Sequence, residues 1–240
     1  APGYVFPIIG GFVGGDTVAG MLATRFDRYQ EATLLVDIGT NGEIVLAHQG
    51  KCYAASTAAG PAFEGARIAC GMRGTHGAIE KVVFNDDVKL EVIGGGAAMG
   101  ICGSGLIDLM AELLRVGIVG SEGRMLLPDE LPKALPAALA ARVRVSENDD
   151  VFFVLAEPSG PAGAPVVLTQ RDVREVQLGS GAIRTGVTLL LREAGLATGD
   201  LKTVLIAGGF GNYIRRLSAQ RIGLLPGGIP TANIRNVGNA

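Results

Sequence analysis

The sequence predicts an α/β protein with a mixed central sheet, flanking helices and an inserted hairpin region. Two apolar runs, residues 34–36 and 44–46, flank an Asn-Gly turn. This is the strongest local signal of a β-hairpin, because both turn residues tolerate positive φ. A long helical pattern from Thr169 is followed by the apolar run 204–207 and at once by a Gly-Gly pair. A strand, a helix and a strand in this order predict a crossover unit with a ligand at the carboxyl edge of the sheet.

The composition fits a globular protein with a sizeable core. The chain has 240 residues, of which 48% are hydrophobic and 18% are charged. Its formal net charge of −2, with acids and bases mixed along the chain, gives no electrostatic case for binding nucleic acid. No apolar run is long enough to span a membrane, and we recognise no signal peptide. We therefore expect a cytoplasmic location without nucleic-acid or membrane partners.

The three cysteines, Cys52, Cys70 and Cys102, lie far apart and form no C-x-x-C pair. Structural zinc or an iron–sulfur cluster within this chain is therefore not expected, and an odd number of cysteines fits the reduced thiols of the cytoplasm. Cys102 is expected to be a small, buried packing residue.

The first helix is predicted to begin near Asp16, because Val18, Met21 and Leu22 follow with helical spacing. Asp16 or Thr17 is a plausible N-cap for this helix. The functional alternative is that the Asp16 carboxylate points into a cleft from the start of the helix.

The hairpin turn carries the most informative chemistry. Asp37 lies at the end of what is predicted to be a buried strand, where an unpaired charge is costly. The turn Gly39-Thr40-Asn41-Gly42 offers several backbone N–H groups and a hydroxyl, which together suit a phosphate. A carboxylate beside such a turn suits a hydrated magnesium–nucleotide complex, because magnesium prefers oxygen ligands and keeps several waters. A plain hairpin without a ligand is the alternative.

The middle of the chain gives weaker signals. Residues 52–57 are predicted to form a third strand, and residues 81–84 and 89–93 a second hairpin. Gly103-Ser104-Gly105 then opens a helix with one apolar face, and an open helix N-terminus can bind an anion. A Gly-x-Gly before a helix is nevertheless common. Residues 117–165 are expected to be an insertion or a surface hairpin without chemistry.

A long helix is predicted from Thr169, with Asp172 completing a capping box. The helix contains three interior glycines, and each costs about 1 kcal/mol relative to alanine, so we expect close approach of another backbone or of a ligand. These are Gly179, Gly181 and Gly186. Arg184 on this helix is a candidate for adenine stacking or a ribose contact, with a solvated helix face as the alternative.

The turn Gly208-Gly209-Phe210-Gly211 directly follows the apolar run 204–207. Glycine at the end of a strand allows a flat ligand to lie against bare backbone. The turn therefore predicts a contact with the adenosine end of a nucleotide, and a plain turn is the alternative.

Taken in order, these segments resemble the second half of an ATPase domain of the acetate and sugar kinase, heat-shock chaperone and actin superfamily. The segment 16–21 looks like a connecting helix with a catalytic aspartate, 35–42 like the second phosphate loop, and 206–211 like the adenosine motif. The resemblance implies an actin-like, ribonuclease H-like ATPase lobe over residues 33–240, preceded by a connecting helix over residues 1–32. It also implies ATP or ADP with magnesium, held by Asp37 through water, and catalytic roles for Asp16 and Asp37.

The chain is more closely similar to the carboxyl-terminal domain of the ATP-dependent reductive activators of corrinoid proteins. The similarity is carried by Asp37-Ile38-Gly39-Thr40-Asn41-Gly42-Glu43 and by segments 59–66, 102–108, 170–177 and 207–211. It implies that ATP drives an uphill electron transfer to an over-oxidised cobalt, in a corrinoid protein of a methyltransferase system, from an upstream iron–sulfur cluster. The implied partners are nucleotide and the corrinoid protein, and a homodimer stays open.

The chain departs from this family in having no ferredoxin-type cysteines and no first phosphate loop, so we read it as a fragment that is inactive alone. Two alternatives remain open. The first is a small-molecule (sugar or acyl) kinase with Asp16 as the base, and the second is a partner-binding module that binds no nucleotide. Cys102 carries a further alternative, because activators of 2-hydroxyacyl-CoA dehydratases similarly have a cluster-binding cysteine before a glycine-rich helix start.

Overall fold

The computed structural model describes residues 5–158, 163–209 and 213–238. The chain forms two compact units. One consists of residues 1–60 and 180–240, and the other of residues 61–179. The division expected from the resemblance, between a connecting helix and a lobe that starts at residue 33, falls elsewhere and stays a prediction. No helix in the described part of the chain is long and apolar enough to cross a membrane.

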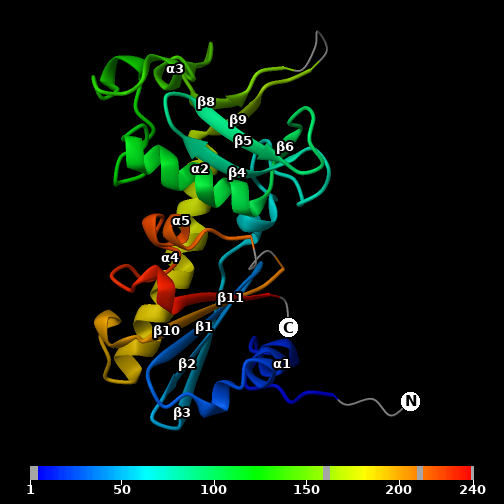
Figure 1. Ribbon diagram of the computed structural model, residues 1–240, viewed down its shortest axis with the longest axis vertical. Helices are drawn as coiled ribbons and strands as arrows, with labels where there is room; N and C mark the ends of the chain where they lie inside the picture. Colours follow the sequence, from blue (N-terminus) through cyan, green and yellow to red (C-terminus); the bar gives the residue numbers. More distant parts are fainter. Residues whose placement is uncertain (1–4, 159–162, 210–212, 239–240) are drawn as a thin grey trace. The chain divides into compact units, whose positions relative to one another are not determined.

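The first unit is built on a five-stranded mixed sheet in the order β11-β10-β1-β2-β3 (Figure 1). The strands are β1 (Thr33–Ile38), β2 (Gly42–His48), β3 (Lys51–Thr57), β10 (Thr203–Ala207) and β11 (Ile234–Gly238). β1 pairs with β2, and β2 with β3, in antiparallel fashion, whereas β1 and β11 each pair with β10 in parallel. The predicted mixed sheet, the Asn-Gly hairpin and the strand after the long helix are all confirmed.

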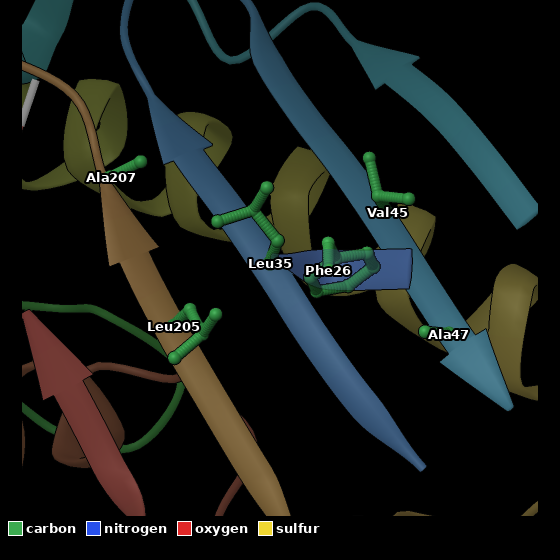
Figure 2. Close-up of a cluster of buried hydrophobic side chains, with 6 residues drawn as sticks. All are labelled: Phe26, Leu35, Val45, Ala47, Leu205 and Ala207. Atoms are coloured by element: carbon green, nitrogen blue, oxygen red, sulfur yellow. The ribbon is translucent and has the colours of Figure 1, made fainter. Parts of the chain in front are cut away.

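Helices cover both faces of this sheet. They are α1 (Gly15–Ala23), the second half of α4 (Gln170–Glu193) and the short α5 (Arg216–Arg221), with the 3₁₀ turns η1 (Phe26–Arg28), η4 (Thr198–Asp200) and η5 (Thr231–Asn233). On one face, Phe26 of η1 packs into an apolar cluster supplied by β1, β2 and β10 (Figure 2). The cluster consists of Phe26, Leu35, Val45, Ala47, Leu205 and Ala207.

The opposite face of the sheet lies against α4 at very short range. A Cβ added at Gly186 would lie 2.5 Å from Thr57 Cγ2 and 2.7 Å from Ile44 Cδ1. A close approach is thus found at Gly186, but to side chains of β2 and β3 rather than to the backbone or ligand that the sequence predicts. It is not found at Gly181, where a Cβ would meet no described atom within 4 Å.

The start of α1 differs from the expectation. Gly14 is the N-cap and α1 begins at Gly15, so neither Asp16 nor Thr17 caps the helix. Asp16 lies inside the first turn, where its Oδ1 accepts a hydrogen bond of 2.8 Å from the Thr17 N–H. The carboxylate still compensates the exposed amides of the first turn, which is a favourable place for an acid.

The second unit contains two three-stranded sheets, in the orders β5-β4-β6 and β7-β8-β9. The strands are β4 (Ala78–Phe84), β5 (Val88–Val92), β6 (Gly100–Ile101), β7 (Val143–Val145), β8 (Val151–Ala156) and β9 (Val166–Thr169). The helices are α2 (Gly103–Val116), α3 (Ala137–Ala140) and the first part of α4, with the 3₁₀ turns η2 (Pro61–Glu64) and η3 (Pro128–Glu130). The predicted second hairpin corresponds to β4 and β5. The status of residues 117–165 as an insertion stays a prediction.

The capping box of α4 is confirmed. Asp172 Oδ2 accepts hydrogen bonds from the Thr169 N–H and hydroxyl at 2.8 and 2.9 Å, and the Asp172 N–H donates to Thr169 Oγ1 at 3.2 Å. The other carboxylate oxygen of Asp172 accepts from the Ala69 N–H at 2.9 Å. One buried side chain therefore both starts the helix and ties a distant loop to it.

Candidate functional site

A cavity of about 300 Å³ lies in the first unit, where β1 and β10 end, and α1 and the hairpin turn contribute to its wall. Its lining residues come from three separate segments of the chain. They are Asp16, Thr17 and Gly20 from α1; Leu35, Asp37, Ile38, Gly39, Thr40, Asn41 and Glu43 from the hairpin; and Ala207, Gly208 and Gly209 from the end of β10. The predicted strand–helix–strand crossover within one sheet is not formed, because β9, the strand before α4, is in a different sheet from β10. The cavity nevertheless lies at the carboxyl ends of two parallel neighbours, β1 and β10, where ligands commonly bind in α/β folds.

Most of the residues predicted for a nucleotide site thus come together. Asp16, Asp37, Gly39, Thr40, Asn41, Gly208 and Gly209 all line this one cavity. Phe210 and Gly211 lie outside the described residues. The remaining predicted residues, which are Gly42, Gly103, Ser104, Gly105 and Arg184, have other surroundings.

The two glycines that end β10 have different physical roles. Gly208 has φ of +106°, and a Cβ there would lie 2.4 Å from the Ile38 carbonyl oxygen and 3.0 Å from Asp37 Oδ1. Only glycine fits such a position. A Cβ at Gly209 would meet nothing within 4 Å. Gly208 therefore lets β10 pass close to β1, whereas Gly209 borders open space in the cavity.

Gly42 in the hairpin is explained by packing. A Cβ there would lie 2.7 Å from Ile183 Cγ1 of α4 and 2.8 Å from Thr57 Oγ1. Its carbonyl oxygen accepts a hydrogen bond of 3.2 Å from Thr57 Oγ1. The turn itself is closed by the Gly39 N–H, which donates to the Asn41 carbonyl oxygen at 3.1 Å.

A row of side chains crosses the sheet at the floor of the cavity. In the strand register, Ala207 is opposite Asp37, Asp37 is opposite Glu43, and Glu43 is opposite Ser56. Directly opposite residues point to the same face, so Asp37 and Glu43 project on the face that also carries the apolar cluster of Figure 2. The Ser56 hydroxyl donates to Glu43 Oε1 at 3.3 Å.

The cavity is strongly acidic. Burial raises the pKa of Asp37, and the nearby Asp16 charge raises it further. Burial also raises the pKa of Glu43, with additional repulsion from Asp37 and Asp16. None of the described lining residues is Lys, Arg or His. Like charges directly opposite each other on paired strands are destabilising, so this pair works against the fold unless a cation enters.

The carboxylates that line the cavity suit a magnesium ion that keeps its water shell better than one that they bind directly. The described residues contain no group of three His, Cys, Asp or Glu side chains placed to hold a metal directly. Magnesium keeps several of its waters and binds through few carboxylates, so Asp37 can hold it through water as predicted. The turn N–H groups and Thr40 lie on the same cavity wall, where a phosphate would meet them.

Glu43 is the residue that the sequence reasoning missed as part of the site. Glu43 is the last residue of the motif that begins at Asp37, but the motif alone predicts no role for it. The signal was available, because a hairpin in which Ile38 pairs with Gly42 necessarily places Asp37 opposite Glu43. The register of the hairpin, rather than the motif letters, reveals the second carboxylate.

Arg184 lines a different cavity, of about 370 Å³, in the same unit. This second cavity shares no lining residue with the acidic one. It is formed by α4, the loop after it, and the segment around the end of α5, through Arg184, Val187, Thr188, Thr198, Gln220, Gly223, Leu224, Pro226 and Gly227. A Cβ at Gly223 would lie 3.2 Å from Arg184 Nη1, so glycine leaves room for the guanidinium. Arg184 is itself exposed, so both the nucleotide contact and the solvated helix face stay open.

Gly103, Ser104 and Gly105 belong to the second unit and are buried. A Cβ at Gly103 would lie 2.0 Å from the Phe63 carbonyl oxygen, and one at Gly105 would lie 2.3 Å from that of Ile79. Close packing therefore accounts for both glycines, and their role in binding stays a prediction. Cys102 is 6% exposed, which confirms a buried packing residue.

Known sequences and structures are similar to this chain over most of its length. A family model described as the C-terminal domain of RACo, the ASKHA domain, matches residues 31–240. The chain belongs to this family. A solved structure titled reductive activator for corrinoid, iron-sulfur protein is 38% identical, with a TM-score of 0.85 over 98% of this chain and 36% of that one. The sequence predicts the fold of the acetate and sugar kinase, heat-shock chaperone and actin (ASKHA) superfamily, and this prediction is therefore confirmed.

Two curated relatives are also similar over nearly the whole chain. The corrinoid activation enzyme RamQ of Eubacterium limosum is 45% identical over 237 residues, which are 97% of this chain and 39% of that protein. The [Co(II) methylated amine-specific corrinoid protein] reductase of Methanosarcina barkeri is 30% identical over 92% of this chain and 40% of that protein. The chain thus spans less than half the length of the relatives that it matches.

Proposed function

We propose that this chain is the ATP-binding and ATP-hydrolysing domain of a protein that couples ATP to the reductive reactivation of a corrinoid protein in a methyltransferase system. The observation that carries the proposal is the acidic cavity, which joins the predicted phosphate turn, the Asp16 helix and the Gly208-Gly209 turn in one space. The names of the relatives support the corrinoid part.

The residues of the cavity have distinct roles in this proposal. Phosphate oxygens are bound by the Thr40 hydroxyl and by N–H groups of the turn other than that of Gly39, which donates to the Asn41 carbonyl oxygen. Asp37 holds the waters of the magnesium ion. When bound, magnesium neutralises phosphate charge and so admits a polyanion to a cavity whose side chains are acidic. Asp16, exposed at the first turn of α1, faces the same space and can accept a hydrogen bond from a water molecule.

The adenosine end lies at Gly209, where the backbone borders open space. Arg184 offers a planar guanidinium in the second cavity, and a planar cation can stack on an adenine ring. The electron source would be an iron–sulfur cluster in a part of the protein outside this chain. The bound corrinoid protein would receive the electron.

The proposal is tested with the protein that contains this domain together with its other domains. We expect it to reduce its corrinoid partner from cob(II)alamin only in the presence of hydrolysable Mg-ATP, and Asp37→Ala to abolish the ATP dependence. Equal reduction with and without ATP would refute the coupling. Transfer of the phosphate to a sugar or acyl acceptor instead of water would favour the kinase alternative, in which Asp16 is the base.

A further inference from the structure

Two acidic side chains, Asp37 on β1 and Glu43 on β2, form a pair across the hairpin. Asp37 and Glu43 are directly opposite each other and project to the same face, and the Asp37 charge adds to the burial that raises the pKa of Glu43. Ser56, the next residue in the row, donates a hydrogen bond to Glu43 Oε1 at 3.3 Å and so fixes its orientation. A carboxylate that is held in place beside a like charge has a position suited to binding a cation.

Thr17 provides an independent sign of a ligand. It lines the same cavity and is only 2% exposed, yet its hydroxyl has no hydrogen-bond partner. A buried hydroxyl without a partner is costly and is uncommon in folded proteins. Rotation about χ1 moves the hydroxyl to one of two other staggered positions, and so offers it another direction from this cavity-lining residue once a partner is present.

We propose that Glu43 and Thr17 are ligand-binding residues of this cavity, and that they contact the water shell of a divalent cation that also binds Asp37. The inference rests on the proposed nucleotide function and adds two residues to its cation site. Glu43 accepts hydrogen bonds from metal-bound water across from Asp37, and Thr17 supplies a hydroxyl from the α1 side.

A water shell, rather than direct ligation, follows from the spacing of the acids. The described residues hold no three acidic groups near enough to bind one metal directly, although the Asp16 charge raises the pKa of both Asp37 and Glu43. Water between the carboxylates and the ion reconciles these two observations. The cavity of about 300 Å³ has room for it, since one water occupies about 30 Å³ in the liquid.

The first experiment uses Glu43→Gln, with the exposed Glu31→Gln as the matched control. We expect Glu43→Gln to raise the melting temperature of the metal-free chain, because one of two facing charges is removed. We also expect the Mg²⁺ concentration needed for half-maximal thermal stabilisation to rise about tenfold, as is typical when a partner of a metal's ligand shell is lost. Glu31→Gln should change neither. An unchanged response to Mg²⁺ in Glu43→Gln would overturn the proposal.

The second experiment uses Thr17→Val, which keeps the shape of the side chain and removes only the hydroxyl. Thr33→Val is the matched control, because Thr33 is equally buried but its hydroxyl donates to the Glu31 carbonyl oxygen at 3.1 Å. We expect Thr17→Val to stabilise the metal-free chain and to weaken the response to Mg²⁺. Thr33→Val should destabilise the chain and keep the response. A Thr17→Val variant with the wild-type Mg²⁺ response would remove Thr17 from the site.

A third experiment distinguishes contact with the cation through its water shell from direct ligation by the carboxylates. Hexaamminecobalt(III) cannot exchange its ligands and presents N–H donors where hydrated magnesium presents O–H donors. We expect it to stabilise the wild-type chain and to do so less in Glu43→Gln, whereas no stabilisation of the wild type would overturn the water-shell contact. If the wild type itself shows no shift with Mg-ADP, the proposed nucleotide function fails. If the wild type responds and both variants respond equally, only this inference fails.

Discussion

Each unit of the molecule places two acidic side chains beside a strand, but the two pairs differ in what surrounds them. On α2, Asp108 and Glu112 are 1% and 6% exposed and accept hydrogen bonds from the Val82 and Phe84 N–H groups of β4. Arg115 adds a charge-assisted hydrogen bond of 2.6 Å to Glu112. β6 pairs with only two residues of β4, so the α2 carboxylates take the place of a longer strand.

The pair in the first unit is the opposite case. Asp37 and Glu43 are half-buried, face one another, and lie in a cavity whose described lining contains no basic side chain. Buried acids with donors stabilise a fold, whereas facing acids without a cation destabilise it. The difference separates a structural use of carboxylates from one that depends on a ligand, and it predicts mutational effects of opposite sign.

The largest effect on folding is expected from Glu112→Ala. It leaves the Phe84 N–H without its acceptor and removes both hydrogen bonds from Arg115 to Glu112, although Arg115 keeps its bond to the Phe84 carbonyl oxygen; this should lower the free energy of unfolding by about 2–3 kcal/mol. Urea denaturation measures the loss. Glu130→Ala, which breaks an exposed ion pair with Arg124, is the control and should change stability little. A Glu112→Ala variant as stable as the wild type would remove the distinction between the two pairs.

The next effect concerns ligand binding. Asp37→Ala should weaken Mg-ATP about tenfold or more and metal-free ATP much less, because the carboxylate acts through the waters of the cation. Isothermal titration calorimetry with and without magnesium measures both affinities. The exposed Asp27→Ala is a suitable control. Equal losses in the two titrations would show that Asp37 does not act through the metal.

A smaller effect on affinity is expected at the adenosine end. Gly209→Val should weaken ADP by about tenfold, or about 1.4 kcal/mol, because the side chain occupies space that the nucleotide needs. The fold should tolerate the change, since a Cβ there meets no described atom within 4 Å. Gly208→Val should instead unfold the turn, because its Cβ would collide with the Ile38 carbonyl. Unchanged ADP affinity in a folded Gly209→Val variant would place the nucleotide elsewhere.

The smallest effect is on pH dependence, where the two units should again differ in sign. The pKa values of Asp37 and Glu43 are raised from 3.8 and 4.5, so their stabilising contribution is complete below those values and is lost as the pH rises through the raised ones. Asp87 is hydrogen-bonded by Arg142, which lowers its pKa from 3.8, so its contribution is present above that value and is lost on acidification.

Thermal unfolding in EDTA tests this contrast. The gain in stability of the Asp37→Asn, Glu43→Gln double variant over the wild type should grow as the pH rises above about 4.5. The loss caused by Asp87→Asn should shrink as the pH falls toward its lowered pKa. If the stability of both variants and of the wild type changed with pH in parallel, the opposite directions assigned to the pKa shifts of the two units would be wrong.

The parts of the structure that were predictable from sequence depend on short-range rules. The Asn-Gly hairpin, the Thr169–Asp172 capping box and the glycine turn after β10 are each specified by residues within a few positions of one another. The position of the candidate nucleotide site could also be predicted, because its motif residues lie at two strand ends and at the start of a helix.

The parts that were missed depend on contacts between distant segments. Gly103 and Gly105 are small because Phe63 and Ile79 pass close to them, and no local pattern distinguishes this from an anion site. Arg184 could be placed on a helix, but its separate cavity needs residues 220–227, whose course is set by tertiary packing. The N-cap of α1 is Gly14 rather than the predicted Asp16 or Thr17, because an extended backbone conformation without a side-chain hydrogen bond precedes that helix.

The contacts of Gly42 and Gly186 have a mechanical consequence. Both glycines leave no clearance between the hairpin and α4, since an added Cβ at either would lie within 3 Å of a side chain on the other element. α4 has 24 residues and therefore extends about 36 Å. A movement of the turn at Gly42 therefore requires the facing side chain of Ile183 on α4 to move as well.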